Sequence, residues 1–444
     1  MTRSAFTSGG LTWALGIEDT CVYPTDPSGT ALDEHVLTDH DVRWRSDLDL
    51  AAELGATALR YGVSWPRVHT APGEFDWESL DQVVAHAVDG LGLTLVADLV
   101  HYGTPTWLAD SFADDGYPAA IEEFAGAIAS RYRDRITHFT PLNEPVTTAS
   151  FCGLRGVWPP ARTGWEGWVS VVMPIALGMT RAIHAIRGAQ PGARIVHVEA
   201  ATNIVTEDPN LDDHARLLTG VGWLPTDLML GRVDASHPMR GWLLQHGASE
   251  AHLGWLTAHG TSPDIMGVNY YPDLTPRRLV SVEGQVMQVS YDRGARGLRE
   301  ALTGFHTRYG LPLAVTETSI EGDDATRTRW LSESVDAVRR LSGEGVDVRG
   351  YTWWPMFDFV DWSWAAGGAN VEEFAVALPK ADGSFEFAPA PPLGDPADGK
   401  TAFLRRMGVV RLEESEEGSL ERLPTEAAHR FASEAMQPAG EGAA

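Results

Sequence analysis

Eight short apolar segments rich in β-forming residues recur along the chain, and helical patterns lie between most of them. Alternation of this kind is typical of a parallel sheet, in which each helix crosses back to start the next strand. Eight βα units favour a closed barrel over an open sheet, so we expect an α/β fold, a single (β/α)8 TIM barrel. The predicted strands are residues 11–16, 57–61, 93–100, 136–143, 194–199, 264–270, 313–317 and 349–354.

Helical spacing and loop composition complete the predicted organisation. The helical patterns include residues 42–55, 80–89, 121–132, 175–187 and 327–341, with one short helix at 425–436. Residues 365–400 are rich in glycine, alanine and proline, so we expect an inserted loop on the face where the strands end. The barrel domain should span residues 1–444, and we expect residues 437–444 to form a disordered tail.

The chain is strongly acidic, with a formal net charge of −27 and a pI near 4.8. This balance argues against nucleic acid as a partner, because nucleic acid needs clustered lysine and arginine. It also argues against an anionic membrane surface. The acidity is typical of a solvated protein surface, and it leaves the oligomeric state open.

Cysteine usage and the N-terminal segment bear on location and cofactors. Cys21 and Cys152 cannot make a disulfide framework, and the chain has no CxxC or HExxH motif. Residues 1–10 lack the apolar core of a signal sequence, and we find no apolar run long enough to cross a bilayer. We therefore expect a cytoplasmic protein without a metal or organic cofactor.

Residues 394–401 fit the phosphate-loop pattern Gly-x-x-x-x-Gly-Lys-Ser/Thr. A proline-rich loop precedes them, where a phosphate loop follows a strand. Pro396 lacks an N–H that the phosphates would need, and Asp395 and Asp398 would repel them. Nucleotide binding is therefore not expected here.

Two carboxylates stand at the ends of two strand-like segments. Glu144 follows residues 136–143, and Pro145 cannot continue a ladder, because it has no N–H. Glu317 ends residues 313–317. In a (β/α)8 barrel the chemistry lies at the C-terminal strand ends, where both carboxylates fall. The pair suits glycosidic bond cleavage, although each glutamate alone could be a structural ion pair.

Six motifs occur in order along the chain: residues 58–67 (ALRYGVSWPR), 100–102 (VHY), 140–145 (TPLNEP), 267–271 (GVNYY), 315–319 (VTETS) and 354–362 (WPMFDFVDW). Together they resemble glycoside hydrolase family 1, the retaining β-glucosidase and β-galactosidase type of (β/α)8 barrel. The resemblance runs from about residue 11 to residue 431. Asn-Glu-Pro alone would be a weak signal, because related barrel glycosidases share it.

The resemblance implies a role for each carboxylate. Glu144 would act as general acid and then as general base, and Glu317 would be the nucleophile that forms a glycosyl-enzyme intermediate. Arg60 and Tyr271 would keep Glu317 ionised, by charge and by hydrogen bonding. The two carboxyl groups should then lie about 5–5.5 Å apart.

The resemblance also implies which side chains bind the sugar. Asn143 would bond the 2-hydroxyl, and His101 and Asn269 would orient other hydroxyls or neighbouring groups. Trp354 and Trp362 would offer apolar faces to the sugar ring. A lone histidine in a barrel is more often a satisfied structural residue, and many of the 16 tryptophans must be core.

The chain departs from the family where the sugar is recognised. Residues 16–19 (GIED) replace a Gln-Ile-Glu segment, so the glutamine that holds the sugar O3 and O4 is absent. Tyr102 replaces a tryptophan, and Asp361 replaces the glutamate that clamps the sugar. Residues 317–319 (ETS) replace Glu-Asn-Gly. These changes leave the carboxylate pair intact.

The main prediction is a retaining β-glycosidase that hydrolyses β-linked glycosides, with a small-molecule glycoside or oligosaccharide as its substrate. We hypothesise that the glycone is not plain glucose, or that Glu18 or Asp19 helps to hold it. Two alternatives stay open: a transglycosidase using the same site, and a non-catalytic carbohydrate-binding barrel. The sequence leaves the sugar and the aglycone undetermined.

Overall fold

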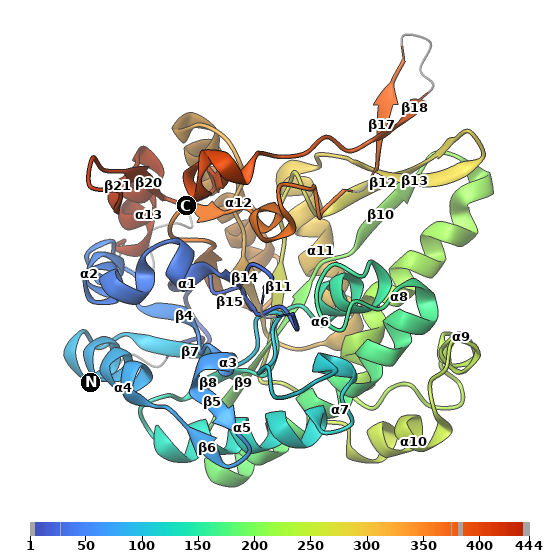
Figure 1. Cartoon of the computed structure of the whole chain (residues 1–444), viewed down its shortest axis with the longest axis horizontal. Coiled ribbons are helices and arrows are strands. Elements are labelled where there is room, and N and C mark those ends of the chain that lie inside the picture. Colours follow the sequence, from blue (N-terminus) through green and yellow to red (C-terminus); the bar gives the residue numbers. More distant parts are fainter. Residues whose placement is uncertain (1–4, 27, 374, 381–384, 438–444) are drawn as a thin grey trace.

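A closed barrel of eight parallel strands forms the centre of the computed structural model, which describes residues 5–26, 28–373, 375–380 and 385–437 (Figure 1). All eight predicted strands are confirmed, and each ends within three residues of its predicted end. They are β1 (Thr12–Gly16), β4 (Ala58–Gly62), β7 (Thr94–Asp98), β8 (His138–Thr140), β9 (Arg194–Ala200), β11 (Ile265–Asn269), β14 (Leu313–Glu317) and β15 (Val348–Trp353).

The predicted helices are present with shifted ends: α2 (His40–Glu53), α4 (Glu78–Val84), α5 (Tyr117–Arg131), α7 (Gly164–Ala189), α12 (Asp324–Gly343) and α13 (Glu426–Ala435). Three long helices were not predicted: α8 (Asp212–Met229), α10 (Glu250–His259) and α11 (Gly294–Tyr309). Inside the barrel, a small apolar cluster includes Ala14, Ala58, Val196 and Ala314, and it is joined by Phe6 from the N-terminal segment. The barrel is therefore a packed core rather than a pore.

Helix α7 corrects the expectation that no apolar run is long enough to span a bilayer. Among the described residues it is the one helix that meets that criterion by length and composition, with a mean hydropathy of 1.5. Its apolar window is 72% buried inside the protein, and α7 packs against α5 and α8. This burial is what a core helix of a large barrel shows.

Two β-hairpins lie above the C-terminal ends of the barrel strands. Strands β12 (Pro276–Val282) and β13 (Gln285–Ser290) form the first, which β10 (Asn203–Thr206) joins as a third strand. The inserted segment 365–400 contains the second, β17 (Ala375–Pro379) and β18 (Phe385–Pro389), where we expected extended loop. Both hairpins extend from the same side of the barrel in Figure 1.

The phosphate-loop pattern at 394–401 forms two short 3-10 turns rather than a loop between a strand and a helix. Lys400 is bound by Asp39, with Nζ and Oδ1 2.9 Å apart. Its ammonium group is thus already paired within the protein, which agrees with rejecting the nucleotide interpretation. Residues 438–444 of the predicted tail lie outside the described residues.

Candidate active site

Glu144 stands at the turn between β8 and the short helix α6 (Pro145–Ala149). Its backbone is left-handed, with φ of 41°, a conformation that costs free energy for any residue other than glycine. The turn is held because the Glu144 amide donates to the Val198 carbonyl oxygen at 3.1 Å. Strand β9 thus holds this strained turn, and the turn sets the direction in which the Glu144 carboxyl group points.

Two donors hold the Glu144 carboxyl group. The Tyr102 hydroxyl donates to Oε2 at 2.7 Å, and the Asn269 amide donates to Oε1 at 2.8 Å. The side chain is buried, but it lines a cavity. Tyr102, which replaces a family tryptophan, therefore contacts the predicted acid/base directly.

Glu317 is the last residue of β14, and its carboxyl group is also held from two sides. Tyr271 donates its hydroxyl to Oε2 at 2.6 Å, and one terminal nitrogen of Arg60 donates to Oε1. The other terminal nitrogen of Arg60 donates to Asn143 Oδ1 at 2.6 Å and to Asp98. The buried guanidinium group thus joins the ends of β4, β7, β8 and β14.

Burial raises the pKa of Glu317 to about 8, while Arg60 acts in the opposite direction and the nearby Glu144 raises the pKa further. Arg60 and Tyr271 therefore lower this pKa as predicted, but they do not by themselves keep the carboxyl group ionised at neutral pH. Burial therefore opposes the ionised form of Glu317 that a nucleophile needs, and the contacts with Arg60 and Tyr271 favour that form.

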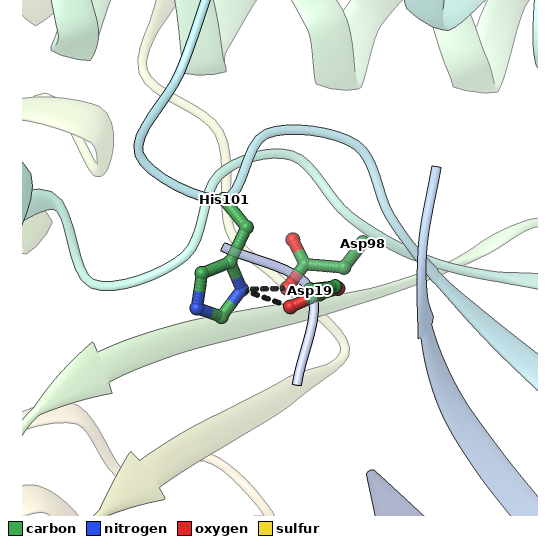
Figure 2. A group of neighbouring side chains, drawn as sticks. All are labelled: Asp19, Asp98 and His101. Atoms are coloured by element: carbon green, nitrogen blue, oxygen red, sulfur yellow. Dashed lines mark hydrogen bonds and ion pairs between the residues drawn. The ribbon is translucent and has the colours of Figure 1, made fainter. Parts of the chain in front are cut away.

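The carboxyl groups of Asp19 and Asp98 both face the same ring nitrogen of His101, Nδ1 (Figure 2). Its Nδ1 lies 2.6 Å from Asp19 Oδ1 and 3.0 Å from Asp98 Oδ2, and its Nε2 lies 3.1 Å from Asn143 Nδ2. These donor atoms could suit a divalent metal, since they lie within 4.8 Å of one another. The imidazole contacts both carboxylates and Arg60 also bonds Asp98, so we propose no metal here.

Trp354 lies directly against Gly16, the residue at the position where the resemblance implies a glutamine. A Cβ atom added at Gly16 would lie 1.7 Å from Trp354 Cε3. The indole Nε1 donates to Glu18 Oε2 at 2.9 Å, and the ring stacks on His101 with centroids 5.4 Å apart. A side chain at Gly16 is therefore incompatible with this position of the Trp354 ring.

Both carboxyl groups face one cavity of about 730 Å3 at the C-terminal end of the barrel. Of the predicted sugar-binding residues, His101, Tyr271, Trp354 and Trp362 line this cavity, as does Glu18. The others do not line it, and each is buried and hydrogen-bonded to other protein groups: Arg60, Asn143, Asn269 and Asp361. Asp361 accepts from the Ser363 amide at 2.8 Å and lies 3.7 Å from Arg405.

Glu199 was not among the predicted site residues. It lies in β9, and its Oε1 accepts from the Val146 amide at 3.2 Å and from the Ala200 amide at 2.9 Å. Burial raises the pKa of Glu199 well above its usual range, and Glu144 adds to the effect. The only signal in the sequence was an acid at the end of the fifth predicted strand.

Comparison with known proteins identifies the family. A model of Glycosyl hydrolase family 1 matches residues 18–237. The chain is 25% identical to "Aryl-phospho-beta-D-glucosidase BglC" of Bacillus subtilis, covering 74% of this chain and 79% of that protein. It is 26% identical to "Bifunctional beta-D-glucosidase/beta-D-fucosidase" of Bifidobacterium breve, covering 72% and 79%.

Solved structures show the same fold. The family 1 β-glucosidase from Thermotoga maritima matches with a TM-score of 0.76 and 16% identity, covering 97% of this chain and 98% of the other. The barrel, the paired carboxyl groups and the family match agree on a retaining β-glycosidase. The chain belongs to glycoside hydrolase family 1, as a divergent member.

Proposed function

We propose that Glu317 and Glu144 cleave a β-glycosidic bond by double displacement. In the first step a Glu317 oxygen attacks the anomeric carbon, the bond to the leaving oxygen breaks, and Glu144 gives its proton to that oxygen. In the second step Glu144 takes a proton from water, the water oxygen attacks the anomeric carbon, and the bond to Glu317 breaks. Two inversions give net retention.

The observation that carries this proposal is that the two carboxyl groups face one cavity and accept hydrogen bonds from different side chains. Arg60 and Tyr271 both donate to Glu317, which favours its ionised form as a nucleophile. Tyr102 and Asn269 fix the direction of Glu144 and leave it facing the cavity. Asn143 orients Arg60 through its oxygen, so a contact with the sugar 2-hydroxyl stays a prediction.

The glycone site supports the hypothesis that plain glucose is not the preferred sugar. No side chain can project from Gly16 past Trp354, and both nitrogens of His101 contact protein atoms. Glu18 lines the cavity, while Asp19 does not. Of the two acids in our hypothesis, Glu18 is therefore the one we propose as a contact for the sugar hydroxyls.

A panel of chromogenic aryl β-glycosides, with glucose, galactose, fucose and xylose as glycones, tests the function. We expect turnover of at least one, with the β-anomer as the first product by proton NMR. An α-anomer would contradict retention, and sugar binding without turnover would favour the non-catalytic barrel. A strong preference for the glucoside would count against the glycone hypothesis.

We also propose a cytoplasmic location. Both cysteines are buried and free, which agrees with a reducing compartment.

A further inference from the structure

The two hairpins above the barrel form one wall of the cavity mouth. Strand β13 packs against β17, and β12 packs against β18, so the hairpins support each other. Residues of β13, β17 and β18 line the same cavity that Glu144 and Glu317 face. The cavity therefore continues from the carboxyl pair outward along this wall, on the side where a leaving group would lie.

This wall presents four apolar side chains to the cavity, together with the polar side chains of Arg277, Gln285 and Gln288. Val286, Met287, Ala375 and Phe387 line the cavity from the hairpins. Val286 is 41% exposed and Phe387 is 43% exposed, and exposed large apolar side chains that gather in one place usually mark a binding surface. Four more apolar residues line the cavity: Ile204 in β10, which pairs with β12, Leu274 just before β12, and Phe151 and Leu154 in the segment after α6. The outer cavity thus has apolar side chains from the hairpin sheet and from the segment after α6.

The charged groups of the outer cavity are already paired. Arg277 donates to Glu373 Oε1 at 2.8 Å, and Arg405 donates to Glu372 Oε1 at 2.8 Å. Arg155 donates to the backbone oxygens of residues 371 and 372 at 2.6 Å each. A second sugar would compete with these ion pairs for the charged groups, and its uncharged polar partners on the hairpins would be Gln285 and Gln288.

We infer that the preferred substrate carries an extended aliphatic aglycone, which lies along the hairpin wall in contact with Val286 and Phe387. This inference rests on the proposed function, because the aglycone is the leaving group of that reaction. The cavity volume of about 730 Å3 exceeds what a single sugar ring needs and lies within the range for larger ligands, roughly 300–1,000 Å3.

A series of alkyl β-glycosides from butyl to decyl tests the inference, each used below its micelle concentration. The glycone is the one that the aryl panel shows to be turned over fastest. The leaving-group chemistry hardly changes along this series, so kcat/KM reports contact with the chain. We expect kcat/KM to rise by about twofold to fourfold per methylene until the wall is covered.

Two results would overturn the inference while leaving the proposed function intact. One is a flat chain-length profile in an enzyme that turns over the butyl glycoside. The other is a higher kcat/KM for a β-linked disaccharide of the same glycone than for the octyl glycoside. An enzyme that turns over no aryl or alkyl glycoside would instead contradict the proposed function.

Two variants and a matched control test which hairpin side chains contact the aglycone. Phe387→Ser and Val286→Ser should each lower the ratio of octyl to butyl kcat/KM by about threefold to tenfold. Leu378→Ser is the control, because Leu378 is 49% exposed on the same hairpin but does not line the cavity. It should leave the ratio unchanged. An equal loss in Leu378→Ser would contradict the assignment to cavity-facing side chains.

Discussion

The indole ring of Trp354 lies where a side chain on Gly16 would begin, since an added Cβ would stand 1.7 Å from Cε3. Gly16→Ala must therefore displace the ring, which also bonds Glu18 and stacks on His101. We expect a loss of about 1–3 kcal/mol in the free energy of unfolding, together with a lower kcat/KM. Urea denaturation and steady-state kinetics check both.

The matched control for Gly16→Ala is Gly254→Ala. Gly254 lies in α10, is exposed, and has no atom within 4 Å of an added Cβ. Alanine there should stabilise the protein by up to about 1 kcal/mol. If Gly16→Ala behaves like this control, Trp354 does not occupy the position described.

Glu144→Gln tests the assignment of the proton donor. The amide keeps the size of the side chain but cannot give a proton to the leaving oxygen, so kcat/KM for an alkyl glycoside should fall by about 10²–10⁴-fold. An aryl glycoside with a strongly acidic phenol needs little protonation of its leaving oxygen. The rate of its first step should therefore fall far less. Equal losses for both leaving groups would show that Glu144 is not the acid.

Tyr271→Phe removes the hydroxyl that donates to Glu317 Oε2 at 2.6 Å. A hydrogen bond to a charged group contributes roughly 1.5–3 kcal/mol, so kcat/KM should fall by about 10–100-fold. The hydroxyl also lowers the pKa of Glu317, and its loss should move the acidic limb of the kcat/KM profile to higher pH. If the acidic limb of the profile stayed at the same pH, the Tyr271 hydroxyl would not lower the pKa of Glu317, even if kcat/KM fell.

The barrel strands could be predicted because their apolar runs and spacing repeat. Both carboxylates could be predicted as site residues because they stand at the ends of such runs. Helix α8 was harder to find, because Pro225 and two glycines lower its helix propensity while buried Leu224 and Leu228 hold it in place. The β17–β18 hairpin lies in a segment whose composition indicates loop. Contacts between distant residues, such as Gly16 with Trp354, leave no mark in local sequence.

Glu199→Gln should change how stability depends on pH. The raised pKa means that folded Glu199 keeps a proton which the unfolded chain releases, so stability falls as pH rises between the unfolded and folded pKa values. Glutamine still accepts from the amides of Val146 and Ala200 but removes this titration. The gain in Tm over wild type should therefore be larger at pH 9 than at pH 5.

The control for Glu199→Gln is Glu416→Gln, which changes an exposed carboxyl group. Its Tm should follow that of wild type at both pH values. A Glu199→Gln effect that is the same at pH 5 and pH 9 would mean that this carboxyl group does not titrate in the range argued here.

The most direct test of the account is azide rescue of Glu317→Ala on an aryl β-glycoside. Without its nucleophile the enzyme should lose at least about 10⁴-fold in kcat. Added azide should restore turnover by attacking the anomeric carbon from the vacated side, which gives the α-glycosyl azide. Glu144→Ala with azide should give the β-glycosyl azide. Turnover of Glu317→Ala at the wild-type rate, or a β-glycosyl azide from it, would contradict the assignment of Glu317 as nucleophile.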